Sequence, residues 1–207
     1  MTPYGIANSS NTSLSELLFA HTQEVHRRST TGMEKALFGS FSPQGYISVL
    51  QRMYGFYRSF EEQFDRFSPL EEWVELAIAL DERRKVPLLQ TDLLTLGIPA
   101  EAQHQIPLCP LPRFETVAQL QGLLWVVEGA TQGYQRTARR IEAALLTNAA
   151  TSFFRSYGSP REVKEMWSSF CQALDFYSTS RPYNTHIIRQ TALEVFLRAE
   201  QWLFPEG

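Results

Sequence analysis

The chain has only two cysteines, Cys109 and Cys171, among its 207 residues. Two cysteines this far apart form neither a redox pair nor the ligand spacing of a zinc site, and they cannot build a disulfide framework. We therefore expect both to be free thiols. Long apolar runs are also missing, because none approaches the ~18 residues of a membrane-spanning helix. The sequence therefore predicts no membrane partner.

An excess of basic charge is absent as well. The chain has 19 Lys and Arg against 22 Asp and Glu, a formal net charge of −3. Because nucleic-acid binding needs clustered basic residues, the composition disfavours nucleic acid as a partner. The opening MTPYGIANSSNTS lacks a basic segment followed by an apolar one. We therefore expect no secretory signal and a cytoplasmic location.

Strand signals are lacking, and helix starts are plentiful. No stretch alternates apolar and polar residues over a useful length. Serine and threonine occur instead where they can cap a helix, either with Glu or Gln three residues later or just before proline. These starts are Ser13 with Glu16, Thr116 with Gln119, and Ser42, Ser68 and Ser159 before proline. The pattern predicts an all-α, single-domain helical bundle.

The helices are expected near 14–30, 43–67, 69–83, 87–96, 116–146, 160–178 and 184–204. The proline-rich stretch 96–114 is predicted to be a long surface loop. Residues 1–13 are predicted to be a disordered segment and residues 14–207 the folded domain.

The predicted helix 116–146 carries an unusual stripe of small residues. At about 100° per residue, Gly122, Val126, Gly129 and Gly133 share one face. Each interior glycine costs ~1 kcal/mol relative to alanine, so the stripe needs a reason. Close packing of another helix and close approach of a flat ligand both remain open. The roughly opposite face is expected to be core: Leu120, Leu123, Leu124, Val127 and Thr131.

Two histidines lie on the predicted first helix. His21 falls within an apolar stripe and is expected to be a buried, hydrogen-bonded core residue. His26 lies on a flanking face with Met33 at heptad spacing and with Thr22 and Thr30 nearby. A neutral imidazole is a good axial ligand for iron, although a lone histidine does not by itself identify a metal site.

The proline-rich stretch contains one pattern typical of a different metal site. Glu101 and His104 match the Glu-x-x-His spacing of di-iron bundles, but such sites need two of these pairs on helices. Here there is a single pair outside the predicted helices, so we expect no metal there.

Two segments together resemble a known family. LSELLFAHTQEVH (14–26) and GLLWVVEGATQGYQ (122–135) are similar to the first and distal helices of biliverdin-producing heme oxygenases, especially the bacterial type that accompanies bacteriophytochromes. Segments 38–62, 83–97 and 153–174 are also similar, so the resemblance covers nearly the whole chain after residue 13. In the family a Thr-x-x-x-His pattern ends on the heme ligand, and Thr22 with His26 matches it.

The resemblance implies a heme-oxygenase-like bundle in which His26 ligates the heme iron. It also implies heme contacts from Thr22, Met33, Val126, Gly129 and Gly133, a propionate contact from Lys164, and a catalytic distal side formed by Gly129, Ala130 and Gly133. The implied reaction cleaves heme with O₂ to biliverdin, CO and ferrous iron. Electrons would come from an external donor such as a ferredoxin or a reductase, since no flavin or nicotinamide motif is present.

The chain departs from the family pattern at several positions. Ala130 stands where members carry Asp or Ser, so Thr131 or Gln132 would have to help hold a distal water. Tyr134 replaces the second glycine of the usual pair, and its direction on the helix predicts core rather than cofactor contact. Thr30 replaces an acidic partner of the ligand histidine, and Phe19 replaces a basic residue near a propionate.

Two alternative functions therefore stay open. The first is a heme- or tetrapyrrole-binding protein of the same fold without turnover. The second is a related helical protein for another ligand, such as a bilin, a thiamine-related compound or a di-iron pair. A separate question concerns the basic residues Arg136, Arg139, Arg140 and Lys164. They form either a basic rim or only a solvated helix face. A basic rim would suit an acidic ferredoxin-like partner or the propionates of the heme.

Overall fold

The computed structural model describes residues 12–67, 69–147 and 150–205, and these residues form helices and loops without a strand. The all-α prediction is confirmed. The segment 1–13 expected to be disordered falls almost wholly outside the described residues, and its last residue, Ser13, caps the first helix. The α-helices are α1 (Leu14–Phe38), α2 (Pro43–Glu61), α3 (Glu71–Val74), α4 (Val86–Thr95), α5 (Ala100–Gln103), α6 (Val117–Leu145), α7 (Pro160–Ser180) and α8 (Thr185–Leu203).

Most of the predicted helix starts are confirmed. The side chain of Ser13 accepts from the backbone N–H of Glu16, and the Glu16 carboxylate accepts from the N–H of Ser13. The same reciprocal capping box begins α6 at Thr116 and α7 at Ser159. Ser42 caps α2, where Pro43 occupies the first position. These local signals place the ends of the long helices that carry the site.

The predicted helix over 69–83 is wrong. The chain forms only the four-residue α3 and a 3₁₀ turn, η2 (Asp81–Arg83), with Ala77 between them at φ 53°. Leu70, not Ser68, precedes α3 and gives no side-chain cap, and Ser68 lies outside the described residues. The Nε1–H of Trp73 donates to the carbonyl of Ile78 at 3.0 Å. Burial of the apolar side chains of this segment prevails over helix propensity.

Other boundaries shift modestly. The first helix continues past residue 30 to Phe38, and the second ends at Glu61, followed by a 3₁₀ turn, η1 (Phe64–Arg66). The proline-rich loop is confirmed except for the short helix α5 within it. A third 3₁₀ turn, η3 (Pro182–Asn184), joins α7 to α8.

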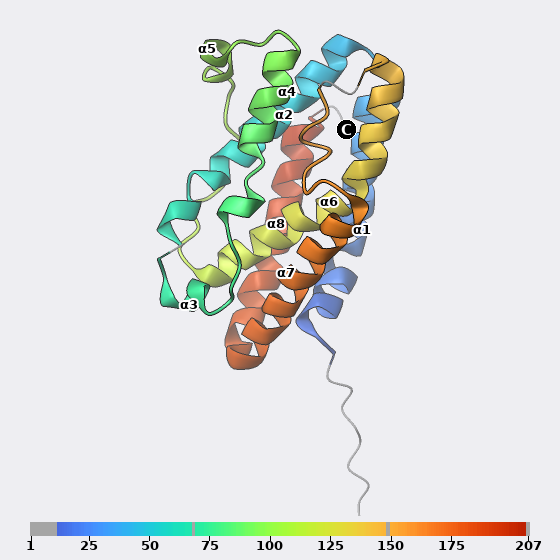
Figure 1. Ribbon diagram of the computed structural model, residues 1–207. Coiled ribbons are helices and arrows are strands. Elements are labelled where there is room, and N and C mark those ends of the chain that lie inside the picture. Colours follow the sequence, from blue (N-terminus) through green and yellow to red (C-terminus); the bar gives the residue numbers. More distant parts are fainter. Residues whose placement is uncertain (1–11, 68, 148–149, 206–207) are drawn as a thin grey trace, which may run out of the picture.

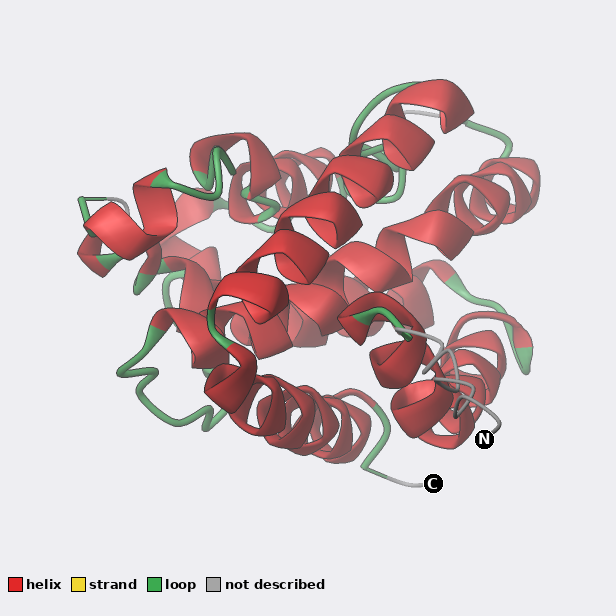
Figure 2. Ribbon diagram, turned by 90° about the horizontal axis from the view of Figure 1, so that it is seen from below, coloured by secondary structure: helices red, strands yellow, loops and turns green. Residues whose placement is uncertain are grey.

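The long helices surround α6, which crosses the molecule (Figures 1 and 2). Helix α6 packs along α8 and α7, and α1 also packs on α8 and α7. Among the described residues, α1 and α6 make little direct contact with each other. Helix α2 packs on α4, α8 and α1 and closes one end of the bundle. Helices α1 and α6 are thus held in place by their shared neighbours α7 and α8, and they do not pack directly against each other.

A buried cluster of charged and polar side chains holds α6 on the side that faces away from α1. Glu128 is 1% exposed and forms an ion pair with Arg83, while the hydroxyl of Tyr157 donates to its other oxygen at 2.7 Å. Nearby, Glu61 on α2 accepts from the backbone N–H of Lys85 at 2.6 Å, and burial raises the pKa of Glu61 to about 7. These bonds join α2, α6 and the segment after η2, and so set the position of α6.

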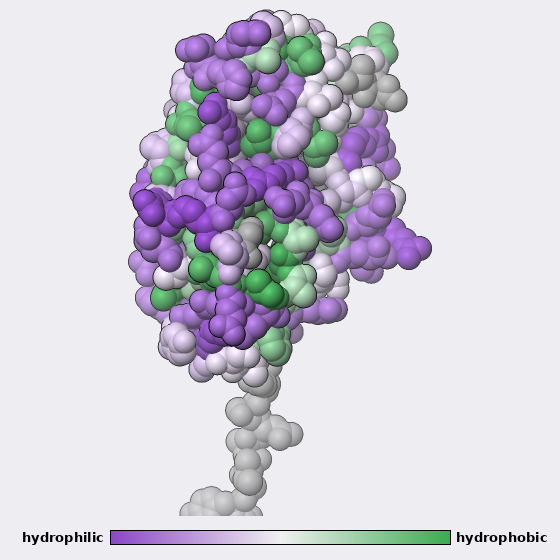
Figure 3. Space-filling model, turned by 60° about the vertical axis from the view of Figure 1, so that its left-hand side comes forward, coloured by the Kyte–Doolittle hydropathy of each residue, from purple (hydrophilic) through white to green (hydrophobic). Residues whose placement is uncertain are grey.

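One face of the molecule is mostly hydrophilic (Figure 3). On the face in Figure 3, hydrophilic side chains cover most of the molecule and leave a smaller apolar area near its middle. No helix in the described part of the chain is long and apolar enough to cross a bilayer. Cys109 is buried, Cys171 is half-buried, and both are free thiols, as the sequence predicted.

Candidate functional site

A cavity of about 390 Å³ occupies the space between α1 and α6. Its walls are mostly apolar, and α2 and α8 close its sides. A smaller cavity of about 230 Å³ adjoins it and shares His26, Gly129, Gln132 and Phe196 with it. Together they are the size of a small-molecule site. The larger one is lined chiefly by His26, Ser29, Thr30, Met33, Met53, Phe56, Tyr57, Val126, Val127, Gly129, Ala130, Gly133, Tyr134, Phe196, Ala199 and Leu203.

Two polar contacts bridge α1 and α6, one on each side of this space. Toward the start of α1, the Nε1–H of Trp125 donates to the hydroxyl of Thr22 at 3.2 Å. Toward its end, Glu34 forms an ion pair with Arg140, whose guanidinium lies 3.7 Å from the centre of the Phe38 ring. Between these contacts, the cavity is lined from α1 by His26, Ser29, Thr30 and Met33, and from α6 by residues that include Val126, Gly129, Ala130 and Gly133. The two bridges therefore lie near the two ends of the site.

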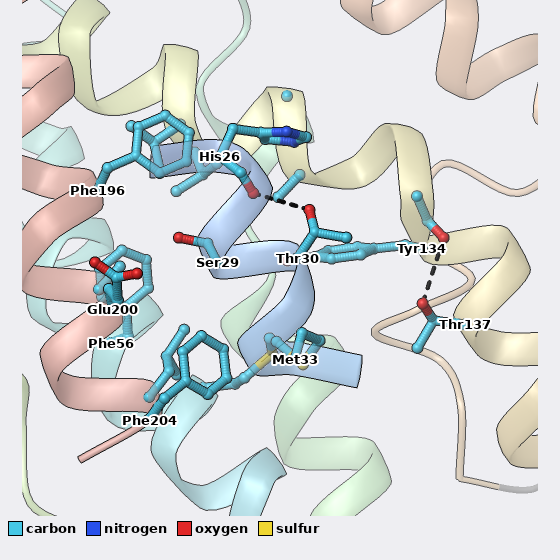
Figure 4. A pocket seen from close by; sticks show the side chains of 18 of the residues that line it. His26, Ser29, Thr30, Met33, Phe56, Tyr134, Thr137, Phe196, Glu200 and Phe204 are labelled. Carbon is cyan, nitrogen blue, oxygen red and sulfur yellow. Dashed lines mark hydrogen bonds between the residues drawn. The ribbon is translucent and has the colours of Figure 1, made fainter. Parts of the chain in front are cut away.

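His26 lies on α1 between the two bridges and lines both cavities. Figure 4 shows its ring projecting from α1 into the space beside α6. The edge of the ring meets Phe196 of α8, with ring centres 6.1 Å apart. Thr30 donates its hydroxyl hydrogen to the backbone carbonyl of His26 at 2.9 Å. Thr30 therefore supports the helix at this point and leaves the imidazole nitrogens available to a ligand.

The prediction that His21 is a buried core residue is wrong. His21 is exposed, and its Nδ1 lies 3.4 Å from a guanidinium nitrogen of Arg189. The buried positions of α1 in this region are Leu18, Thr22 and Val25. The buried face of α1 therefore includes Thr22 in place of His21. Thr22 can be buried because its hydroxyl finds a hydrogen-bond acceptor within the helix. It donates to the carbonyl of Leu18 at 2.8 Å.

The glycines of the stripe divide between close helix packing and an open face toward the cavity. A Cβ on Gly122 would lie 2.6 Å from the carbonyl oxygen of Ile188, so this glycine allows α8 to pack closely. A Cβ on Gly133 would meet nothing within 4 Å, and one on Gly129 would meet only the ring of Trp167 at 3.7 Å. Both of these line the cavity. Bare backbone therefore faces the space opposite His26.

This division predicts opposite effects of two alanine substitutions. Gly122→Ala is expected to lower the free energy of unfolding by about 1–3 kcal/mol, because its methyl group overlaps backbone atoms of α8. Gly133→Ala is expected to raise it by up to ~1 kcal/mol, because alanine favours the helix and the site is open. Urea denaturation of both variants measures the difference. Equal destabilisation by the two substitutions would contradict this placement of the glycines.

The other residues predicted for the site are placed unevenly. Met33 and Val126 line the larger cavity, and Thr22 lines the smaller one. Lys164 is exposed on α7 and lines neither cavity, so its predicted propionate contact has no support from the geometry. The basic residues of α6 divide likewise, since Arg140 pairs with Glu34 while Arg136 and Arg139 are exposed.

On the α6 side of the cavity, one of the two residues expected to help hold a water cannot do so. Ala130 lines the cavity with a methyl group, as its identity requires. Thr131 cannot help there, because it is buried and its hydroxyl donates to the carbonyl of Glu128 at 2.6 Å. Gln132 lines both cavities and remains available on the α6 side.

Sequence reasoning missed a pair of tyrosines. Tyr57 of α2 and Tyr134 of α6 both line the larger cavity, and their hydroxyl oxygens are 3.1 Å apart. Tyr134 also packs against Phe153 and Phe154, so it is a core residue that reaches the cavity as well. Burial raises the pKa of both tyrosines, which keeps them protonated. Tyr57 lies in an aromatic-rich helix, and nothing in its local sequence marks it out.

Comparison with known proteins identifies the architecture. No model of a known protein family matches the chain, and no curated protein sequence matches it significantly. Solved structures do match. The heme oxygenase from Leptospira interrogans superposes with a TM-score of 0.73 at 19% identity, over 93% of this chain and 99% of that one. The NO- and CO-bound heme oxygenase from Neisseria meningitidis superposes with a TM-score of 0.70 at 17% identity, over 94% and 98%.

The chain has the heme oxygenase fold. The likeness spans nearly all of both chains, so the predicted heme-oxygenase-like bundle is confirmed as a fold. Because one fold can serve several functions, the activity has to be argued from the cavity itself.

Proposed function

We propose that this protein is a heme oxygenase, which binds heme in the cavity between α1 and α6 and cleaves it with O₂ to biliverdin, CO and ferrous iron. The observation that carries the proposal is His26 facing the bare backbone of Gly129 and Gly133 across an apolar cavity. An imidazole on one side and two glycines of a helix on the other suit a flat, apolar ring that contains iron.

The residues present fit a heme. Aromatic and aliphatic side chains from α2 and α8 line the cavity. The ring nitrogens of His26 form no hydrogen bond with the described residues, and the ring contacts Phe196 by its edge. A bound heme would supply the iron that takes O₂ and the ring that is cut. The heme is the substrate, so the protein must hold it without enclosing it permanently. Because His26 is exposed, the cavity that it lines can be reached from outside.

Each part of the site has a distinct task in this proposal. His26 holds the iron through a ring nitrogen, and Phe196 restricts the imidazole by contact with its edge. Gly129 and Gly133 bring the backbone of α6 close to the ring, where a side chain would exclude O₂. Met33 and Val126 exclude water from the apolar faces. The main task of the protein is therefore to orient the ring.

The supply of electrons and the fate of the product complete the proposal. The chain contains no flavin or nicotinamide motif. We infer that a ferredoxin or a reductase in the cytoplasm delivers the electrons. The sequence resemblance suggests that the biliverdin supplies a bacteriophytochrome.

The second candidate is a heme-binding protein that does not turn its ligand over. Ala130 favours it, because the cavity has a methyl group where an acidic or hydroxyl side chain would anchor a water. Both candidates require heme binding, and they differ only in whether the reduced heme is cleaved.

A hemin titration tests the proposal and separates the candidates. Purified protein is titrated with hemin, and the Soret band is followed after addition of ascorbate or a ferredoxin system in air. Decay of the Soret band with growth of the broad red absorbance of biliverdin is the expected result. A Soret band that persists under reductant and O₂ would favour the carrier. If hemin produces no Soret shift, the heme proposal is overturned and only the fold remains.

A further inference from the structure

Tyr57 and Tyr134 both line the larger cavity, and their hydroxyl groups contact each other. Their oxygens are 3.1 Å apart, and both residues are more than nine-tenths buried. They come from different helices, α2 and α6, so tertiary packing brings them together. Neither hydroxyl has another hydrogen-bond partner among the described residues.

A count of hydrogens shows what this pair can offer. Two phenol hydroxyls carry two hydrogens, and one of these is used in the bond between them. The hydroxyl that accepts this bond keeps its own hydrogen, which has no acceptor in the part of the chain that the structure describes. Leaving a buried hydroxyl hydrogen without an acceptor is unfavourable, so the second hydrogen is expected to find a partner in the cavity. Burial raises the pKa of both phenols, which therefore remain neutral donors across physiological pH.

Most of the other polar groups that line the cavity are already engaged. Glu34 and Glu200 form ion pairs with Arg140 and Arg28. The hydroxyls of Thr30 and Thr137 donate to backbone carbonyls of their own helices, and Figure 4 shows both bonds.

Two lining groups are less committed, but neither is as well placed. Ser29 has an unpartnered hydroxyl, but it belongs to α1, the helix that carries His26. Gln132 is exposed, and its amide makes a 3.5 Å contact with the carbonyl of Val163. The tyrosine pair is therefore the buried, neutral donor on a wall that α1 does not form.

We propose that the Tyr57–Tyr134 pair donates a hydrogen bond to the small ligand that shares the cavity with the heme, and so performs the task that Ala130 cannot. This inference rests on the proposed binding of heme. One tyrosine donates to the other, and the second donates into the cavity, directly or through one water. The bond between the two hydroxyls strengthens the terminal donor.

Fluoride binding to the ferric heme complex tests the inference without turnover. Fluoride is a small anion whose affinity depends on hydrogen-bond donors near the iron. The double variant Tyr57→Phe/Tyr134→Phe is expected to raise the fluoride Kd at least about tenfold, the loss of one hydrogen bond to a charged acceptor. The C–O stretch of the CO complex is expected to move to higher frequency. The single variant with the larger effect identifies the terminal donor, and the single variants serve alone if the double variant does not fold.

Tyr46→Phe is the matched control. Its buried hydroxyl donates to the carbonyl of Ala150 at 2.6 Å and does not line the cavity. It should leave the fluoride Kd and the C–O stretch unchanged. An unchanged Kd and stretch in all the Tyr57 and Tyr134 variants, with a normal Soret band, would overturn this inference and leave the proposed function standing. If the unmodified protein binds no heme, the inference and the proposed function both fail.

Discussion

Replacing His26 with alanine is expected to remove the proposed iron ligand and to lower heme turnover by at least about 100-fold. Loss of a residue that merely supports a metal ligand costs 10–100-fold, so loss of the ligand itself should reach or pass the upper end of that range. Heme should still enter, because the walls of the cavity are mostly apolar. The measurement is the Soret position and the rate of its decay under reductant and O₂.

His21→Ala is the matched control for this experiment. His21 lies five residues earlier on the same helix, is exposed, and lines neither cavity. Its removal should leave both the spectrum and the rate unchanged. Added imidazole should restore a normal spectrum to His26→Ala, because the space of the lost ring is open to the cavity. A normal spectrum and rate in His26→Ala without added imidazole would show that another residue binds the iron.

Arg83→Met is expected to destabilise the fold by about 3–5 kcal/mol, the usual loss when one partner of a buried ion pair is removed. The side chain of Arg83 is 3% exposed and that of Glu128 is 1% exposed, so the carboxylate would be left uncompensated in the core. Tyr157 would still donate one hydrogen bond to it, which is too little to replace a charge. Equilibrium unfolding in urea gives the change in free energy.

An exposed ion pair provides the control for that variant. Arg161 pairs with Glu165 one turn away on α7, and its side chain is 85% exposed. Arg161→Met should produce no measurable change, since solvent screens such pairs. If Arg83→Met were as harmless as Arg161→Met, the buried cluster would not be what holds α6 in place.

Because Gly129 follows Glu128 directly, Arg83→Met should also weaken heme binding at temperatures where the protein is still folded.

Local signals are why the long helices could be predicted. Ser13, Thr116 and Ser159 satisfy the first N–H groups of their helices through side chains a few residues away, so no distant contact is needed. The short segment after Ser68 shows the opposite case. Trp73 gains its hydrogen bond and its burial from a bent chain, and that gain outweighs a helix of average propensity.

The candidate site was only partly open to prediction. The spacing of Thr22 and His26, through the family resemblance, singled out one histidine, and the glycines marked one face of α6. Neither pattern could show that Gly122 packs against α8 while Gly133 faces open space, because that depends on where α8 lies. The exposure of His21 likewise depends on the small rotation of α1 that buries Thr22.

By itself, the sequence determined the helical class, the caps that begin the long helices, and the presence of a histidine and a bare glycine face, since these follow from short-range periodicity and hydrogen bonding. Only the tertiary structure decided that α1 and α6 stand apart, that Thr22 and Arg140 bridge them at opposite ends, and that Tyr57 meets Tyr134 at the wall. Those outcomes depend on contacts between residues far apart in the chain, whose energies no local pattern encodes.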